Sequence, residues 1–273
     1  VSKGRAIQNL INIEQDDKVK AFICTQDLKD EEYINNHYVI MATKKGQVKK
    51  TSLEQYSRPR TNGINAITIK EDDELLEAKL TNGDSQVMIA LKSGKAIRFE
   101  EAKTRPMGRG ASGVRGVRLQ NDQDEAIGMI AVNEMDSDIL VVSENGYGKR
   151  SSLEDYRITN RGGKGVKTIS ITEKTGALVA IKNVSDNDDL MIINKSGIAI
   201  RLAVENLRVM GRATQGVKLI NLKTNDSIAA VAKVMHEEDE EITDETAVNE
   251  VLMDNTDNQT SEPKSDESTN KNE

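Results

Sequence analysis

The sequence predicts an all-β, propeller-like fold built from four-stranded blades, followed by a disordered acidic C-terminal tail. Three observations support this prediction. A pattern of about fifty residues repeats along the chain, each repeat carries short apolar or alternating runs separated by glycines, and no strong helical periodicity occurs before residue 235. A single blade cannot bury both of its faces, so the blades must stack on one another.

Each repeat begins with a run of consecutive apolar residues, which predicts a strand covered on both faces. The four runs span residues 39–42, 87–90, 139–142 and 190–193. A glycine follows each run and predicts a two-residue hairpin turn, because glycine accepts the positive φ that such a turn requires. These hairpin glycines are Gly46, Gly94, Gly146 and Gly197, at separations of 48, 52 and 51 residues.

The second half of each repeat is organised around another glycine, which lies in a polar loop and is followed by a β-branched residue. These loop glycines are Gly63, Gly113, Gly165 and Gly216, at separations of 50, 52 and 51 residues. An alternating second strand, such as residues 96–99, precedes the loop, and an alternating third strand, such as residues 166–171, follows it. An acidic turn, such as residues 71–74, then leads to a fourth strand, such as residues 178–181.

The repeats divide the first 235 residues into one partial and four complete blades. The partial blade spans residues 1–37 and includes a polar insert, and the complete blades span about 38–85, 86–137, 138–188 and 189–235. The tail, residues 236–273, has 14 acidic and 2 basic residues and a net charge of -12, whereas the rest of the chain has a net charge of +5. High charge with low hydrophobicity predicts a disordered tail. The first residue is a valine inside a repeat, so we expect the chain to be part of a longer protein.

The composition excludes several kinds of site. One cysteine and two histidines cannot form an intrachain disulfide or a Cys/His metal centre. No apolar run approaches the roughly 20 residues of a membrane helix, and there is no signal peptide, so we expect a reducing cytoplasm and Cys24 buried in an apolar strand. The sequence contains no nucleophile elbow and no phosphate-binding P-loop. Tyr56 and Tyr156 occupy equivalent repeat positions typical of packing, and we predict no catalytic residue, metal site or cofactor in this chain.

Basic residues recur at fixed distances from the two kinds of glycine. Four residues after the hairpin glycines stand Lys50, Arg98, Arg150 and Arg201. Eight residues before the loop glycines stand Arg105, Arg157 and Arg208, four before them Arg109, Arg161 and Arg212, and two after them Arg115, Lys167 and Lys218. The first repeat departs from this pattern and carries Arg58 and Arg60 in its loop, while Arg118 and Lys164 add charge to later repeats.

Stacked repeats place equivalent positions at equivalent points, so these residues predict a continuous positive track along the blades. A curved positive track suits bent duplex DNA, which carries one charge per about 1.7 Å of its axis. Arginine at the loop positions favours bidentate phosphate contacts. The glycine-rich loops at residues 107–113 and 161–165 can bring backbone N–H groups close to a phosphate. The alternative is that the cations are solvated, or paired with the acidic turns.

Four segments show a more specific likeness: residues 9–17 (NLINIEQDD), 46–51 (GQVKKT), 113–119 (GVRGVRL) and 145–150 (NGYGKR). They resemble the repeats in the C-terminal domain family of the A subunit of DNA gyrase, and the resemblance covers residues 1–235. It implies a β-pinwheel, a relative of the propeller in which blades exchange a strand, usually with six blades. The family's first-blade box, Gln-Arg-Arg-Gly-Gly-Lys-Gly, is matched only by residues 161–165, preceded by Thr159 and Asn160, so we expect a degenerate copy there.

The resemblance also implies a role within an ATP-dependent type II topoisomerase, an isomerase. The cleaving tyrosine, the metal site and the ATPase of such an enzyme lie elsewhere, so ATP and magnesium belong to the parent complex only. The domain would bend duplex DNA around its basic rim without sequence specificity and thereby support negative supercoiling. The implied partners are double-stranded DNA, the rest of the homodimeric A subunit of gyrase, and the B subunit in a complex of two A and two B subunits. The implied location is the cytoplasm, on the nucleoid and away from membranes.

Two alternatives remain open from the sequence. The equivalent domain in the A subunit of topoisomerase IV shares these features, and an intact box upstream would favour gyrase instead. A propeller scaffold that binds proteins through its loops can also have repeats of similar length. The acidic tail likewise has two interpretations, as a competitor of DNA for the basic rim or as a solubilising segment.

Overall fold

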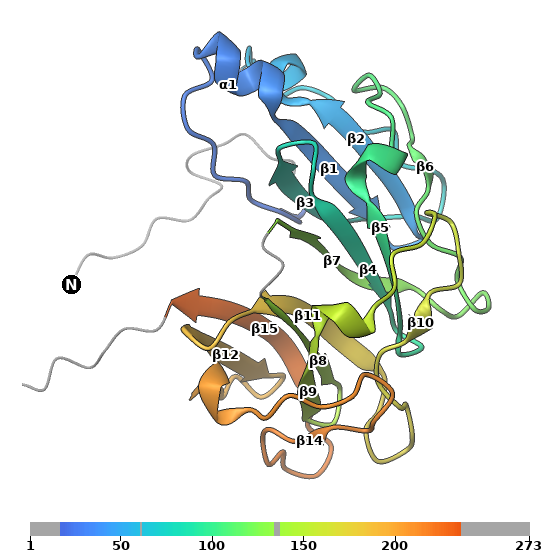
Figure 1. Cartoon of the computed structure of the whole chain (residues 1–273), viewed down its shortest axis with the longest axis vertical. Coiled ribbons are helices and arrows are strands. Elements are labelled where there is room, and N and C mark those ends of the chain that lie inside the picture. Colours follow the sequence, from blue (N-terminus) through green and yellow to red (C-terminus); the bar gives the residue numbers. More distant parts are fainter. Residues whose placement is uncertain (1–16, 61, 134–136, 236–273) are drawn as a thin grey trace, which may run out of the picture. The chain divides into compact units, whose positions relative to one another are not determined.

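The computed structural model describes residues 17–60, 62–133 and 137–235 (Figure 1). Within these residues it confirms the predicted all-β fold, with three sheets of four strands and one sheet of three strands following one another along the chain. The acidic tail that was predicted to be disordered, and the start of the partial blade up to residue 16, lie outside the described residues.

Three long antiparallel strands form the body of every blade. They are β1 (Tyr38–Thr43), β2 (Gln47–Ser52) and β3 (Leu75–Thr81) in the first sheet, β4 (Gln86–Leu91), β5 (Lys95–Glu100) and β7 (Ala126–Val132) in the second, β8 (Asp138–Ser143), β9 (Tyr147–Ser152) and β11 (Leu178–Val184) in the third, and β12 (Asp188–Asn194), β13 (Ala199–Ala203) and β15 (Ile228–Met235) in the fourth. Every residue of β1, β4 and β8 except the first is buried. The predicted coverage on both faces is therefore confirmed for these three strands, but it is wrong for the fourth run, because Ile193 in β12 is exposed.

A short fourth strand completes three of the sheets, and it comes from the following repeat. β6 (Val114–Arg115) pairs with β2, β10 (Val166–Lys167) with β5, and β14 (Val217–Lys218) with β9, all antiparallel. Neighbouring blades therefore exchange a strand, as the resemblance implied.

The predicted third strand at residues 166–171 is wrong in length and in the sheet that it joins. Only Val166 and Lys167 pair with a strand, because the next two N–H groups converge on one acceptor. Thr168 N and Ile169 N both donate to Gly94 O, at 2.9 and 3.3 Å. This convergence on the hairpin glycine ends the exchanged strand after two residues.

The loop glycines bring each exchanged strand close to its acceptor blade. A Cβ at Gly165, where φ is +70°, would lie 2.6 Å from Ala96 O. The glycines before β6 and β14 have the same surroundings, with a backbone oxygen of the acceptor strand at 2.6 Å and a positive φ. Gly63 also has a positive φ, of +74°, but a Cβ there would meet no atom within 4 Å. Substitutions at Gly165 and Gly63 therefore distinguish the cost of a steric clash from the cost of a positive φ.

Gly165→Ala is expected to lower the free energy of unfolding by about 3 kcal/mol or more, because the strained φ and the collision with Ala96 O act together. Gly63→Ala, its control, is expected to cost about 1 to 2 kcal/mol from the positive φ alone. Urea unfolding followed by circular dichroism measures both changes. Equal losses for the two variants would contradict the close approach of the exchanged strand.

The hairpin turns contain the predicted glycines but not the predicted two-residue loops. Between β1 and β2 the chain passes through Lys44, Lys45 and Gly46, and Gly46 N donates to Thr43 O at 2.9 Å. The φ of Gly46 is +78°, so the glycine is the left-handed last residue of a three-residue loop. The turn length was therefore predicted wrongly, although the reason for the glycine holds.

Short helices occupy positions that the sequence analysis left as loops. α1 (Glu31–Asn36) lies in the polar insert, where the carboxylate of Asp30 accepts hydrogen bonds from Glu32 N and Tyr33 N at 3.0 and 3.2 Å and caps its first turn. Single-turn 3-10 helices follow the second strand of each blade: η2 (Leu53–Tyr56), η3 (Glu101–Lys103), η4 (Leu153–Asp155) and η5 (Val204–Asn206).

Cys24 is exposed and lies outside any strand, so its predicted burial is wrong. Its neighbours Ala21 and Ile23 pack against the apolar cluster of the first blade, and the alternation of an extended chain then turns Cys24 outward. Tyr56 and Tyr156 pack as predicted, Tyr156 as a member of a core cluster and Tyr56 against the cluster of the first blade.

The apolar core is shared between successive blades. One cluster contains Ile40 of the first blade and Ile89 of the second, and another contains Met88 of the second and Val141 of the third. Each central strand therefore contributes alternate side chains to the cluster on either side of it. This sharing holds equivalent positions of the blades in a fixed relation to one another.

Candidate nucleic-acid interface

The predicted basic residues separate into an exposed set, a set engaged in packing or ion pairs, and the half-buried Arg109, Arg161 and Arg212. The exposed set consists of Arg58, Arg60, Arg105, Arg115, Arg118, Arg157, Lys164, Lys167, Arg208 and Lys218. Within the described part of the chain, none of these ten forms an ion pair with a carboxylate. Their charge is therefore available to an external anion.

Three of the four cations that stand four residues after the hairpin glycines are buried at packing contacts, and the fourth, Arg201, is exposed. Lys50 pairs with Glu101 of the second blade at 2.8 Å, and the two side chains are only 5% and 0% exposed. Arg98 donates from Nη1 to Leu153 O and Tyr156 O of the third blade, at 2.6 and 2.9 Å. Burial lowers the pKa of Arg98 from its ordinary value, and Glu154 opposes that shift.

Arg150 and Arg201 at the same repeat position are held by carboxylates. Arg150 Nη1 forms an ion pair with Asp186 and lies 3.6 Å from Asp138 Oδ2. Arg201 Nε lies 2.6 Å from Asp189 Oδ2. We therefore correct the sequence prediction and remove the buried Lys50, Arg98 and Arg150 from the candidate DNA contacts, whereas the exposed Arg201 stays a prediction.

Arg161 and Arg212 make the same pair of hydrogen bonds in consecutive loops. Arg161 donates from Nε to Lys103 O at 3.0 Å and from Nη1 to Arg115 O at 3.1 Å. Arg212 donates from Nε to Asp155 O at 3.0 Å and from Nη1 to Lys167 O at 2.7 Å. Each bond set fastens a loop to the preceding repeat, and it uses two of the five N–H groups of the guanidinium. Both arginines therefore remain candidates for phosphate contact while they also stabilise the loops.

Two exposed basic positions recur at the same place on three blades. The residues that follow Arg105, Arg157 and Arg208 form parallel bridges to the second strand of the preceding blade, at Lys50, Arg98 and Arg150. Arg115, Lys167 and Lys218 lie in the exchanged strands, which pair near the start of that same second strand. Backbone pairing thus fixes both cations along the second strand of the first three blades. We call Arg105, Arg115, Arg157, Lys167, Arg208 and Lys218 the exposed basic track.

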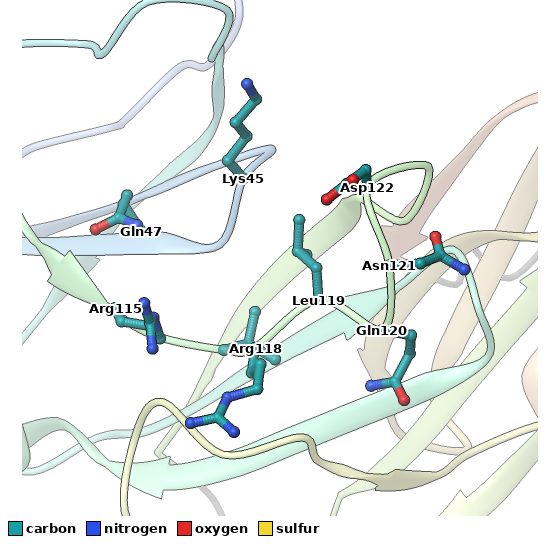
Figure 2. A pocket seen from close by; sticks show the side chains of 9 residues that line it. Lys45, Gln47, Arg115, Arg118, Leu119, Gln120, Asn121 and Asp122 are labelled. Carbon is teal, nitrogen blue, oxygen red and sulfur yellow. The ribbon is translucent and has the colours of Figure 1, made fainter.

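An open polar pocket of about 650 Å³ adjoins the exchanged strand β6 (Figure 2). Lys45 and Gln47 of the first hairpin line one side, and the segment with Arg115, Arg118 and Asp122 lines the other. Three cations and one carboxylate give its wall a positive balance, which suits a phosphate group.

A pocket of about 280 Å³ occupies the equivalent place beside β14, where Lys218 and Lys223 contribute positive charge. The sequence analysis missed Lys45 and Lys223 as candidates because basic residues do not recur at their positions, which are basic in one repeat for Lys45 and in only two repeats, as Lys70 and Lys223, for the other. At the position of Lys45, for example, the second and third repeats have Ser93 and Asn145.

The described residues contain no group of three His, Cys, Asp or Glu side chains that could hold a metal ion. None of the helices in that part of the chain is long and apolar enough to cross a membrane. The exposed guanidinium and ammonium groups of this surface can bind an anion.

A protein-family model described as the DNA gyrase C-terminal domain, beta-propeller, matches the chain four times. The matches span residues 37–82, 87–133, 137–185 and 188–235. Each of them covers the three long strands of one blade, except for Gln86 at the start of β4.

Two curated relatives illustrate the likeness in sequence. The DNA gyrase A subunit of Staphylococcus epidermidis (strain ATCC 12228) is 44% identical over 239 residues, which make up 87% of this chain and 26% of that protein. The DNA gyrase A subunit of Staphylococcus aureus (strain NCTC 8325) is 42% identical over 260 residues, or 94% of this chain and 29% of that protein. The chain thus spans less than a third of the length of these relatives.

Solved structures show the same arrangement of blades. A DNA gyrase A C-terminal domain is similar with a TM-score of 0.75 and 26% identity, over 86% of this chain and 76% of that chain. The C-terminal domain of a DNA topoisomerase IV is similar with a TM-score of 0.78 and 23% identity, over 92% of this chain and 76% of that chain. The second likeness is one of fold alone.

Proposed function

Because the chain belongs to the family of DNA gyrase C-terminal domains, we propose that it binds duplex DNA along the exposed basic track and bends it from blade to blade. The observation that carries this proposal is the recurrence of two cations at one place on three consecutive blades, without carboxylate partners among the described residues. Such an array contacts phosphates at intervals and reads no base edges, so binding is independent of sequence.

The free-energy cost of bending DNA explains why a repeated array of cations suits this function better than a single basic patch. Curving a site of 20 to 30 base pairs by 40 to 90° costs on the order of 1 to 6 kcal/mol. Several phosphate contacts must act together to offset that cost. Cations fixed by backbone pairing on successive blades supply those contacts without further ordering of the protein.

In the longer protein, the proposed role is to present wrapped DNA to the strand-passage machinery of an ATP-dependent type II topoisomerase. Its partners are then double-stranded DNA, the rest of the homodimeric A subunit of gyrase, and the B subunit in a complex of two A and two B subunits in the cytoplasm, on the nucleoid. ATP and magnesium serve that complex, and this chain contributes no catalytic group. We prefer gyrase to topoisomerase IV because the relatives at 42 to 44% identity carry the gyrase name.

Fluorescence anisotropy with two duplexes of unrelated sequence tests the proposal. Affinity is expected to differ by less than about threefold between the duplexes, and to fall by about 10³-fold or more between 0.05 and 0.2 M salt, because several counterions are released. Salt-independent binding, or a strong preference for one duplex, would contradict phosphate recognition by the track. Pull-down from a lysate with and without nuclease tests the protein-scaffold alternative, since proteins that bind the loops directly stay bound after nuclease treatment.

A further inference from the structure

Two buried lysines lie beneath loops that carry the exposed basic track. Lys49 in β2 is 0% exposed and Lys149 in β9 is 1% exposed. Both stand three residues after a hairpin glycine, where the second and fourth blades have Ile97 and Ile200. A buried ammonium group costs free energy unless hydrogen bonds compensate it, so its acceptors indicate its role.

The acceptors of both ammonium groups include a carbonyl oxygen of the glycine-rich loop donated by the next repeat. Lys49 Nζ donates to Ala66 O at 2.5 Å and to Arg109 O at 3.0 Å. Lys149 Nζ donates to Gly211 O at 2.5 Å. Each loop lies between two cations of the track, Arg105 and Arg115 for the first and Arg208 and Lys218 for the second.

We propose that Lys49 and Lys149 are positioning residues that fix these two loops, and with them the adjacent track cations, in the conformation that contacts DNA phosphates. The inference rests on the proposed DNA-binding function. Charge-assisted hydrogen bonds are stronger than neutral ones, and they act here on segments without regular secondary structure. The second loop also has the bonds of Arg212 to the preceding repeat. Within the described residues, no side-chain hydrogen bond of Arg109 provides an equivalent bond for the first loop.

The charged groups near Lys49 and Lys149 link the protonation of these lysines to the binding of an anion. Burial, together with the positive charge of Arg109, lowers the pKa of Lys49 to about 8. Tyr56 also faces this site, donating to Ala66 O at 3.1 Å, and burial raises its pKa. A phosphate at Arg109 would offset the like charge and favour protonated Lys49, so a rise in pH through about 8 is expected to weaken DNA binding.

Lys149 has comparable surroundings in the third blade. Burial lowers its pKa to about 8, while Asp155 raises it and Arg212 lowers it. The hydroxyl groups of Tyr156 and Thr168 form a hydrogen bond nearby, and burial raises the pKa of Tyr156. A phosphate at Arg212 is therefore expected to favour protonated Lys149, as a phosphate at Arg109 favours protonated Lys49.

The test uses Lys49→Ile, Lys149→Ile and the double variant of the 273-residue chain. Isoleucine already occupies the equivalent positions of two blades, so these variants are expected to fold. Lys92→Ile is the control, because it removes one positive charge from an exposed side chain in a hairpin turn. Amide hydrogen exchange of residues 107–113 and of the equivalent residues 210–216 reports on the loops, and anisotropy with a duplex of about 40 base pairs reports on binding.

In the double variant, both loops are expected to exchange faster and DNA affinity at pH 7 to fall about tenfold. Wild-type affinity is expected to fall between pH 7 and 9.5 with a midpoint near 8, and this pH dependence is expected to disappear in the double variant. The control is expected to keep wild-type exchange and the wild-type pH profile, with an affinity loss of about twofold from its charge.

Unchanged exchange in both loops of the double variant overturns the inference, because the lysines then do not hold them. Faster exchange with wild-type affinity and a wild-type pH profile also overturns it, because the loops then do not set the DNA contacts. Failure of the wild-type chain to bind DNA removes the proposed function, and the inference with it. That outcome is recognised without any variant, so the two failures are distinguishable.

Discussion

Replacing all six residues of the exposed basic track by glutamine is expected to weaken duplex DNA binding by about a thousandfold at 0.15 M salt. Each cation that neutralises a phosphate releases condensed counterions, so the slope of log affinity against log salt concentration should fall by about five. All six side chains are exposed and glutamine is polar, so the fold should be little affected. Anisotropy of a labelled duplex over a series of salt concentrations measures both effects.

A matched pair of variants separates the track from net charge. Lys79 lies on β3, at the sheet edge opposite the exchanged strand β6, and Lys233 lies on β15, at the edge of the fourth sheet opposite β13. Changing these two lysines to glutamine removes the same charge as changing Arg115 and Lys218. We expect an affinity loss of about tenfold for the track pair and about twofold for the control pair. Equal losses would contradict the track and leave only the overall charge as an explanation.

Glu101→Ala is expected to lower the free energy of unfolding by about 3 to 5 kcal/mol, because it leaves a buried ammonium group without its carboxylate. The Glu101 side chain is fully buried between the first and second blades and lies 2.8 Å from Lys50 Nζ. It also accepts hydrogen bonds from Thr81 Oγ1 at 2.8 Å and from Ser85 N at 3.3 Å. Denaturant unfolding of the variant and the wild type measures the difference.

Two further variants identify the cause of that loss. The double variant Lys50→Met, Glu101→Leu should recover most of the stability, since an apolar pair of similar volume can replace a buried ion pair. Lys92→Ala breaks the exposed pair with Glu125, whose side chains are 47% and 39% exposed, and should cost less than about 0.5 kcal/mol. A Glu101→Ala loss no larger than this control would show that the buried pair does not stabilise the blade contact.

The blade architecture could be predicted because the fold requires glycine wherever the chain reverses or passes close to a neighbouring strand. Gly46 and Gly165 represent the two requirements, and their spacing reveals the repeat. The exchanged strand could not be assigned to a sheet from the sequence. Residues 166–171 alternate as any half-buried strand does, and the sheet that they join depends on where the preceding loop carries them.

The candidate site was predictable only in part. Periodicity shows that a position has the same surroundings in each blade, but it does not show whether those surroundings are solvent or a packed neighbour. Arg105 and Arg98 are equally periodic, yet Arg105 is exposed and Arg98 is buried against the next blade. Lys49 and Lys149 could not be predicted from periodicity, because their position is lysine in the first and third blades and isoleucine in the second and fourth.

Because each short strand comes from the next repeat, the exchanged strands pair in a fixed order while the ribosome synthesises the chain. The outer edge of β2 stays open until residues 114–115 have emerged and paired with it. Each of the first three blades is thus completed by a segment translated after it, and completion proceeds from the N-terminal side. An open edge on a nascent chain is a template for wrong pairing, so the pace of translation becomes one of the conditions for correct assembly.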